Sequence, residues 1–217
     1  MTEPMTPAEM AAKLVFHVKQ EAVDDLTAFG AMVADKNEVM NLVGPLTLPH
    51  YWSRHVLDSA QLLNLRPNAQ TWADLGAGAG FPGVVLAILL KHTADAPNVY
   101  LIDSLAKRCR FLEAVVAELA LPAVVINDRA ENLNLRVDVV TARACAPMTR
   151  LLGFAERFIH NGADAWFLKG ENVGEELSEA GKAWRFQVEQ SESLSDPRGR
   201  VVHIQGLQRA KSSTRTR

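Results

Sequence analysis

The stretch that decides the fold is Thr71–Leu90, whose sequence is Thr-Trp-Ala-Asp-Leu-Gly-Ala-Gly-Ala-Gly-Phe-Pro-Gly-Val-Val-Leu-Ala-Ile-Leu-Leu. Its first residues, Trp72 to Leu75, are typical of the end of a short buried strand. Glycines then alternate with alanines and an apolar run begins at Val84, which predicts a strand, a glycine loop and a helix in succession. Pro82 suits the first helical position, because its missing N–H costs nothing there.

The spacing of the loop glycines fits more than one kind of site. Gly78, Gly80 and Gly83 satisfy the G-x-G-x-x-G pattern of dinucleotide enzymes. Asp103 also lies at the distance expected for the ribose-binding acid of those enzymes. A nucleotide enzyme such as a dehydrogenase therefore stays open as an alternative, and so does a tight turn that binds no ligand.

Three details of the same loop favour S-adenosylmethionine. Asp74 directly precedes the glycines and is placed at a strand end, where it can meet the cationic methionine end of that cofactor. The run Gly76-x-Gly78-x-Gly80 is the pattern of class I methyltransferases. Phe81 and Pro82 crowd the helix entrance that a pyrophosphate would use and remove one N–H donor from it.

Length and composition limit the remaining possibilities. The chain has 217 residues, 48% of them hydrophobic, which suits one large domain or a domain with an extension. The net charge of −2 gives no global basic field, so any RNA contact must come from local patches. Cys109 and Cys145 have no metal-ligand spacing, which predicts no metal site and suits a reducing cytoplasm. Met1–Met10 does not resemble a signal peptide, and the longest apolar run, Val84–Leu90, is too short to span a membrane.

The residues before the glycine loop are expected to form a helical N-terminal extension, 1–70, packed on the core. Apolar residues recur at helical spacing from Pro7 to about Val43, and Gly44 with two prolines breaks the pattern. A second helix is expected to run through Leu63. In it, His55 and Asp58 are three residues apart and therefore share a face. They are either a packed histidine with a solvated or capping acid, or, together with Arg54, part of a site beside the glycine loop.

The core, 71–207, is expected to be a Rossmann-like α/β domain of the class I S-adenosylmethionine-dependent methyltransferase type. Helical patterns alternate with strands expected near residues 72–75, 98–103, 124–126, 137–141 and 163–168. Two alternating segments, 184–190 and 200–204, then predict a closing antiparallel hairpin. The result is a central, mostly parallel, seven-stranded sheet. The segment 208–217 is basic without apolar runs, and we expect it to be a disordered tail.

Several strand ends carry side chains suited to a site. Asp103 can accept hydrogen bonds from both ribose hydroxyls, although capping the next helix would also explain it. The segment Arg129–Glu131 follows the third strand and is expected over the adenine. Arg143 follows the fourth strand, where burial is costly without an anionic or carbonyl partner. Lys169 stands at the end of the fifth strand.

Six stretches in order resemble one family. They are Asn41-Leu42-Val43, Arg54-His55-Val56-Leu57-Asp58-Ser59, the glycine loop Asp74–Gly83, Leu101-Ile102-Asp103-Ser104-Leu105-Ala106-Lys107-Arg108, Arg129-Ala130-Glu131 and Ala142-Arg143-Ala144. Together they resemble the RsmG (GidB) family of small-subunit ribosomal RNA guanine-N7 methyltransferases. The resemblance covers roughly residues 10 to 205, and the second and fourth stretches are its most specific parts.

The resemblance implies S-adenosylmethionine as cofactor, bound by Gly76, Phe81, Ala130, Glu131 and Arg143, with Asp103 as the ribose acid. It also implies a guanine of the decoding-region (530) loop of 16S rRNA as the target, presented as rRNA or as the 30S subunit. We expect a monomer without metal. A methyltransferase of another RNA or of a protein stays open as the alternative, and a pure RNA-binding module is disfavoured by the net charge.

The chemistry of this target needs no general base, because guanine N7 carries an in-plane lone pair and no proton. We therefore expect catalysis by proximity and alignment. Arg143 and Lys169 are candidates to hold a phosphate or the guanine O6, and Asp58 and His55 are further candidates beside the loop.

Overall fold

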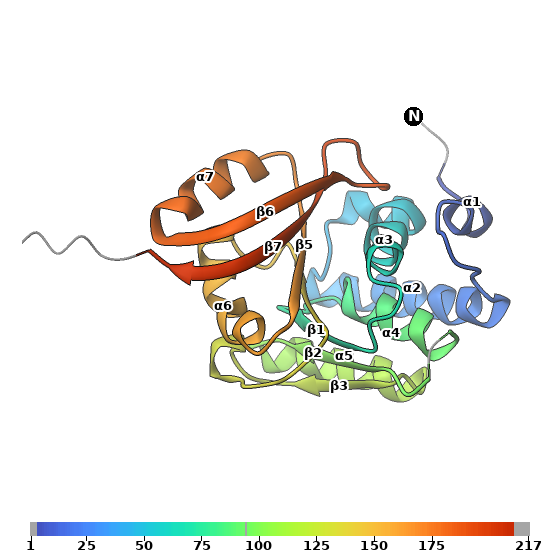
Figure 1. Cartoon of the computed structure of the whole chain (residues 1–217). Helices are drawn as coiled ribbons and strands as arrows, with labels where there is room; N and C mark the ends of the chain where they lie inside the picture. The colour runs from blue at the N-terminus through green and yellow to red at the C-terminus, as the bar shows by residue number, and fades with distance from the viewer. Residues whose placement is uncertain (1–3, 94, 211–217) are drawn as a thin grey trace, which may run out of the picture.

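The computed structural model describes residues 4–93 and 95–210 (Figure 1). A seven-stranded sheet has the order β3-β2-β1-β4-β5-β7-β6, and β7 runs antiparallel to its neighbours β5 and β6. The strands are β1 (Thr71–Leu75), β2 (Asn98–Ile102), β3 (Ala123–Ile126), β4 (Val139–Arg143), β5 (Asp164–Lys169), β6 (Trp184–Glu192) and β7 (Arg200–Arg209). The predicted α/β class and the mostly parallel seven-stranded sheet are confirmed.

Helices cover both faces of the sheet. They are α1 (Pro7–Ala11), α2 (Gln20–Met40), α3 (Asp58–Leu65), α4 (Gly83–Lys91), α5 (Ala106–Glu118), α6 (Met148–His160) and α7 (Val173–Ala183). One hydrophobic cluster joins α2, α3, α4 and α5 and includes Trp72 of β1, whereas a second joins α6 and α7 and includes Ala73. Because neighbouring strand residues point to opposite faces, the two clusters lie on opposite sides of the sheet.

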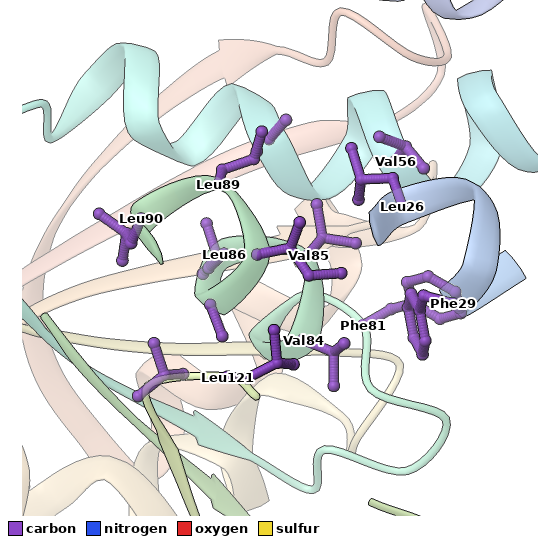
Figure 2. Packing of buried hydrophobic residues seen from close by; sticks show 14 of the residues in the cluster. Leu26, Phe29, Val56, Phe81, Val84, Val85, Leu86, Leu89, Leu90 and Leu121 are labelled. Carbon is purple, nitrogen blue, oxygen red and sulfur yellow. The ribbon is translucent and has the colours of Figure 1, made fainter. Parts of the chain in front are cut away.

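Helix α4 is buried along its length, from Gly83 to Leu90. Its side chains contact Leu26 and Phe29 of α2 on one side, and Phe81 of the preceding loop packs against Phe29 with the ring centroids 5.2 Å apart (Figure 2). The glycine loop is thereby anchored in the centre of the core. This placement fixes the position of the loop backbone.

The N-terminal extension differs in part from the prediction. Residues 12–19 are not helical, so α1 and α2 are separate helices. In that link Leu14, Phe16 and Val18 are half-buried against the core while Val15 is 76% exposed. This period of two belongs to an extended chain, and it overrides the helical spacing that the sequence shows.

The segment with the glycine and two prolines is a 3-10 helix, η1 (Pro45–His50). The next turn is a π-helix, η2 (Trp52–Leu57), which continues directly into α3. Of the N-terminal helical elements, α1, α2, η2 and α3 contribute buried residues that pack in one cluster with α4, so the extension and the core share one hydrophobic cluster.

Several predicted boundaries shift. Strand β4 begins two residues later than expected and ends at Arg143, and β5 ends at Lys169, so both cations are the last residues of their strands. Pro82 precedes α4, which begins at Gly83. Strand β7 extends to Arg209 because it pairs with β6 as far as Trp184, so the first residues of the expected tail belong to the sheet. The remainder of that tail, 211–217, lies outside the described residues.

No helix in the described part of the chain has the length and apolar content that a membrane crossing requires. Within the same residues, no three His, Cys, Asp or Glu side chains are grouped to hold a metal ion.

Candidate active site

A cleft of about 700 Å³ opens at the carboxyl ends of the parallel strands. Its lining comes from the segment between α2 and η1 together with η1, the η2–α3 turn, the glycine loop, Arg108 of α5, the ends of β4 and β5 with the segments that follow them, and the loop after β6. Ligands of open α/β sheets bind at this edge. The topology therefore brings residues from distant parts of the sequence to one place.

The glycine loop supplies the first wall of the cleft. Gly76 and Gly78 have φ values of +71° and +56°, which L side chains rarely adopt. A Cβ on Gly76 would lie 2.5 Å from the Sγ of Cys145, so that position has no room for a side chain. The N–H of Gly78 donates to Asp103 Oδ2 at 3.0 Å. The loop thus places its backbone directly on the cleft.

Asp74 lies beneath the loop and is fully buried. Its Oδ2 accepts the N–H of Gly83, the first residue of α4, at 2.8 Å, while its Oδ1 has no hydrogen-bond partner among residues 4–93 and 95–210. Burial raises the pKa of this carboxyl to about 7, and the Gly83 N–H and the charge of Arg143 offset part of that effect. Asp74 is therefore an anchor for the entrance of α4, and it does not line the cleft.

Asp103 joins the loop to the start of α5. Besides Gly78, its carboxylate accepts the N–H of Leu105 at 2.8 Å, and Arg108 lies 3.6 Å away. Leu105 is the capping residue of α5, so Asp103 supports the helix start without being the cap itself. Each carboxylate oxygen can accept a second hydrogen bond, which leaves acceptor capacity on Asp103 for a ligand.

Arg143 is the hub of the second wall. Its Nη1 donates to the carbonyl of Arg54 at 2.9 Å and to Asp58 Oδ2 at 3.2 Å, and its Nη2 lies 2.9 Å from His55 Nδ1. Its guanidinium lies 4.8 Å from the ring centroid of Phe81. Burial lowers the pKa of Arg143 and Asp58 opposes that effect, which is the anionic partner that a buried arginine requires.

The contact with Arg143 determines which ring nitrogen of His55 carries a proton. A guanidinium only donates, so His55 Nδ1 accepts and carries no proton. The other ring nitrogen, Nε2, lies 2.9 Å from Thr47 Oγ1 and donates to it. Burial, and then the charges of Arg143 and Arg54, lowers the pKa of His55 to about 3. His55 is consequently neutral at physiological pH and links β4 to η1.

Asp58 joins this wall to the loop between β6 and β7. Its Oδ1 accepts from Ser195 at 2.8 Å and from Gln61 at 3.1 Å. Gln61 in turn accepts the N–H of Leu194 at 2.9 Å, and Arg54 pairs with Asp196. We name this set of contacts, made by Arg54, Asp58 and Gln61 with residues 193–196, the latch. The latch holds the β6–β7 loop beside α3, where Figure 1 shows it at the top of the molecule.

Lys169 closes the far end of the cleft. Its ammonium lies 2.5 Å from Glu176 Oε2 and donates to the carbonyl of Ala146 at 3.1 Å. Glu176 also accepts the N–H of Met148, at the start of α6. Lys169 therefore connects the segment that follows β4, through Ala146, to α7, through Glu176.

Most of the predicted site residues meet in this cleft. Its lining includes Arg143, His55, Asp58, Lys169, Gly76, Gly78 and Phe81, but it does not include Asp74, Asp103, Ala130 or Glu131. The last two lie on the short 3-10 turn η3 (Ala130–Asn132) that follows β3. Residues that the prediction missed include Thr47, Glu176 and the 195–199 segment.

Comparisons with known proteins bear on the fold and on the family. Two solved structures share the fold: a methyltransferase from Podospora anserina with SAH bound (TM-score 0.63, 10% identity, 91% of this chain and 92% of that one), and magnesium protoporphyrin IX methyltransferase from Synechocystis PCC 6803 with SAM bound (TM-score 0.53, 12% identity, 88% and 100%). At this identity they show the class I methyltransferase fold alone.

Closer relatives are found by sequence. Ribosomal RNA small subunit methyltransferase G of Caulobacter vibrioides is 61% identical over 87% of each chain, and that of a Bradyrhizobium species is 41% identical over 93% of each. The family model GidB, rRNA small subunit methyltransferase G, matches residues 22–204. The chain therefore belongs to the rRNA small subunit methyltransferase G (GidB) family.

Proposed function

We propose that this protein transfers a methyl group from S-adenosylmethionine to N7 of a guanine in the 530 loop of 16S rRNA. The observation that carries the proposal is the convergence of the family's motif stretches on one cleft. Five of the six stretches are far apart in the sequence yet line this cleft, through Leu42 and Val43, through Arg54, His55 and Asp58, and through the glycine loop, Arg108 and Arg143. The sixth, Arg129–Glu131, lies outside its lining. An RNA substrate is what membership of the family implies.

The residues present fit the cofactor. The glycine loop offers backbone without Cβ atoms, Asp103 has acceptor capacity for ribose hydroxyls, and Asp74 Oδ1 is a buried carboxylate oxygen without a partner near the loop. We propose that Gly76, Gly78, Phe81, Asp103, Ala130, Glu131 and Arg143 hold S-adenosylmethionine, with Asp74 beneath its methionine end. When bound, this cofactor supplies an electrophilic methyl group on a sulfonium.

The chain's own contribution is placement. Guanine N7 needs no deprotonation, and the neutral, already hydrogen-bonded His55 is not available as a base. Correct alignment of two reactants is worth on the order of 7–11 kcal/mol at best. Arg143 and the latch fix the wall against which the guanine lies, and Asp58 keeps Arg143 in position. Lys169 holds the segment after β4 and lies near enough to the cleft to meet a phosphate or O6.

The target base must leave its stack to reach the cleft. The N7 edge faces the major groove, which in A-form RNA is too narrow for side chains. A guanine in a loop, or one flipped out of a helix, presents that edge at lower cost. A loop of 16S rRNA is consistent with this requirement.

The remaining parts of the proposal concern the protein's context. We propose that it acts on 16S rRNA or the 30S subunit in the cytoplasm as a monomer without a metal. The helical extension, 1–70, and the core, 71–207, then work as one structural unit, because both contribute to the cleft.

The test is transfer of labelled methyl groups to three substrates that lack the modification: naked 16S rRNA, 30S subunits and bulk protein. Label at one guanine, located by cleavage at 7-methylguanine, is the expected result. Label in protein that resists ribonuclease, or at another RNA, would identify the alternative substrate and overturn the proposal. A titration with NAD that shows tight binding, with none for S-adenosylmethionine, would overturn the cofactor as well.

A further inference from the structure

A second groove, of about 520 Å³, lies between α2 and α5 outside the cleft. Its charged residues are Lys36 and Asp35 from α2 and Lys107 and Arg110 from α5. Met32, Met40, Phe111 and Ala114 complete its lining. The groove therefore combines three cations and one carboxylate with an apolar floor.

The three cations have no charged partner within the described part of the chain. In residues 4–93 and 95–210, Lys36, Lys107 and Arg110 make no ion pair within 4.0 Å, whereas Arg54, Arg143 and Lys169 of the cleft are all paired. The side chains of Lys107 and Arg110 are exposed, and Lys36 is partly exposed. Positions 107 and 110 share a face of α5, so both cations point to the same side.

Both walls of the groove continue into the cleft. After α2 ends at Met40, Leu42 and Val43 line the cleft. On α5, Arg108 lines the cleft while its neighbours line the groove. A polyanion that enters the cleft is thus led along α5 toward three unpaired cations.

We propose that this α2–α5 groove binds the sugar-phosphate backbone of the substrate RNA next to the target guanine. The inference rests on the proposed function and extends the RNA site beyond the cleft. Charge complementarity selects RNA as the occupant, because the protein as a whole is acidic, with a net charge of −2, and has no global field to attract it. The half-buried Met32 and Met40 give an unstacked base an apolar surface.

The test compares two triple variants of equal charge change. The groove variant carries Lys36→Gln, Lys107→Gln and Arg110→Gln. The control carries Arg136→Gln, Arg157→Gln and Lys182→Gln. Arg136 precedes β4, at the end of the strands opposite to the cleft, whereas Arg157 of α6 and Lys182 of α7 lie on the other face of the sheet. Circular dichroism and S-adenosylmethionine affinity, both expected unchanged, verify the folds.

The groove variant is expected to raise the KM for unmodified 30S subunits tenfold or more while kcat stays the same. Its binding to a naked 530-loop RNA should depend less on salt, with a slope of log K against log salt that is shallower by about 2, at about 0.7 per lost contact to a single strand. The control should leave both quantities unchanged. An unchanged KM and slope in the groove variant, or an equal loss in the control, would overturn the proposal.

Two further readouts sharpen the result. Asp35→Asn removes the one carboxylate of the groove and should tighten RNA binding, whereas Asp24→Asn, also exposed and on the same helix, should not. If the groove variant lowers activity on 30S subunits but binds naked RNA normally, the groove contacts a ribosomal protein and the RNA proposal is wrong. Because the salt slope measures binding and not methyl transfer, it reports on the groove even if the modified atom proves to be a different one.

Discussion

The two walls of the cleft are stabilised in opposite ways. The glycine-loop wall is backbone packed against a buried helix, where Gly83 and Asp74 leave no space for an added atom. The second wall, which contains Arg143, is held by the latch, and we call it the latch wall. The latch consists of side-chain contacts between residues more than 130 positions apart, such as Gln61 with Leu194. The first is rigid because of sterics and the second is held by exchangeable polar contacts. A single substitution in the first wall should therefore cause a large loss of stability, whereas a single substitution in the second should cause a small one.

The largest effect is expected for Gly83→Ala. The new Cβ would lie 2.7 Å from Asp74 Oδ2 and would overlap Leu101, so the entrance of α4 must shift. Overpacking of this kind costs about 3 kcal/mol, and loss of the Gly83–Asp74 hydrogen bond adds about 1 kcal/mol. Urea unfolding should show a loss of about 4 kcal/mol.

Gly181→Ala is the matched control. Gly181 lies in α7, and no atom of the described residues outside its own helix turn lies within 4 Å of the added Cβ. Alanine is favoured over glycine inside a helix by up to about 1 kcal/mol, so this variant should be slightly more stable than the wild type. Equal losses in the two variants would contradict the steric account of the loop wall.

The next largest effect is the pH dependence of stability that Asp74, beneath the glycine loop, should cause. The pKa of Asp74 is raised from 3.8 to about 7, so the folded state holds a proton that the unfolded chain releases. The stability from this proton is complete below pH 3.8 and is lost as pH rises to 7. Between pH 5 and 7 the loss is about 3 kcal/mol, at about 1.4 kcal/mol per pH unit.

Asp74→Asn removes this titration and can still accept the Gly83 N–H. The stability of the variant should not vary with pH through this position, so the stability of the wild type relative to the variant should fall by about 3 kcal/mol between pH 5 and pH 8. Urea unfolding of both proteins at the two pH values measures it. A gap that is constant with pH would mean that Asp74 is ionised in the folded protein throughout this range.

The loop wall could be predicted from the sequence, and the latch wall could not. A strand end, alternating glycines and an apolar run are local signals, because positive φ and close backbone approach leave few residue choices. The closing hairpin was also evident from its alternation. These patterns sufficed for the fold class, for a mostly parallel seven-stranded sheet and for a ligand site at the strand ends.

The partners of polar side chains follow from tertiary structure alone. Nothing near Asp58 in the sequence indicates Ser195, and nothing near Lys169 indicates that Glu176 occupies its ammonium. The same limit applies to Leu14–Val18, where helical spacing and extended spacing coincide and packing decides. The glutamate at 176 carries only one weak signal, its place in the first turn of the helix after β5.

A smaller effect is expected in catalysis for Asp58→Asn. The amide keeps one oxygen for Arg143 or for the latch but not the negative charge that stabilises the buried guanidinium. If N7 needs no base, methyl transfer should fall about tenfold by the same factor at every pH from 6 to 8.5, because about 1.4 kcal/mol of alignment is lost. Rates measured with saturating S-adenosylmethionine test this.

The shape of the plot of methyl-transfer rate against pH shows whether Asp58 is a general base or positions Arg143. The wild type should show no inflection near pH 6.5, since the pKa of His55 is lowered to about 3. If the wild-type rate follows one carboxylate pKa and Asp58→Asn abolishes this dependence, Asp58 acts as a base and the alignment mechanism is wrong. Asp24→Asn, on the surface of α2, should leave the rate unchanged.

The smallest effect is expected for Ser195→Ala, which removes one hydrogen bond of the latch. Asp58 Oδ1 keeps Gln61 and Ser193 as donors, so the free energy of unfolding should fall by at most about 1 kcal/mol. The loop should nevertheless open more often, and the amide of Leu194, which Gln61 protects, should exchange its hydrogen several times faster. Ser191→Ala, on exposed β6, is the control and should change neither quantity. Faster exchange at Leu194 with nearly unchanged stability would establish the latch as the adjustable wall; a collapse as large as that of Gly83→Ala would show that both walls are equally rigid.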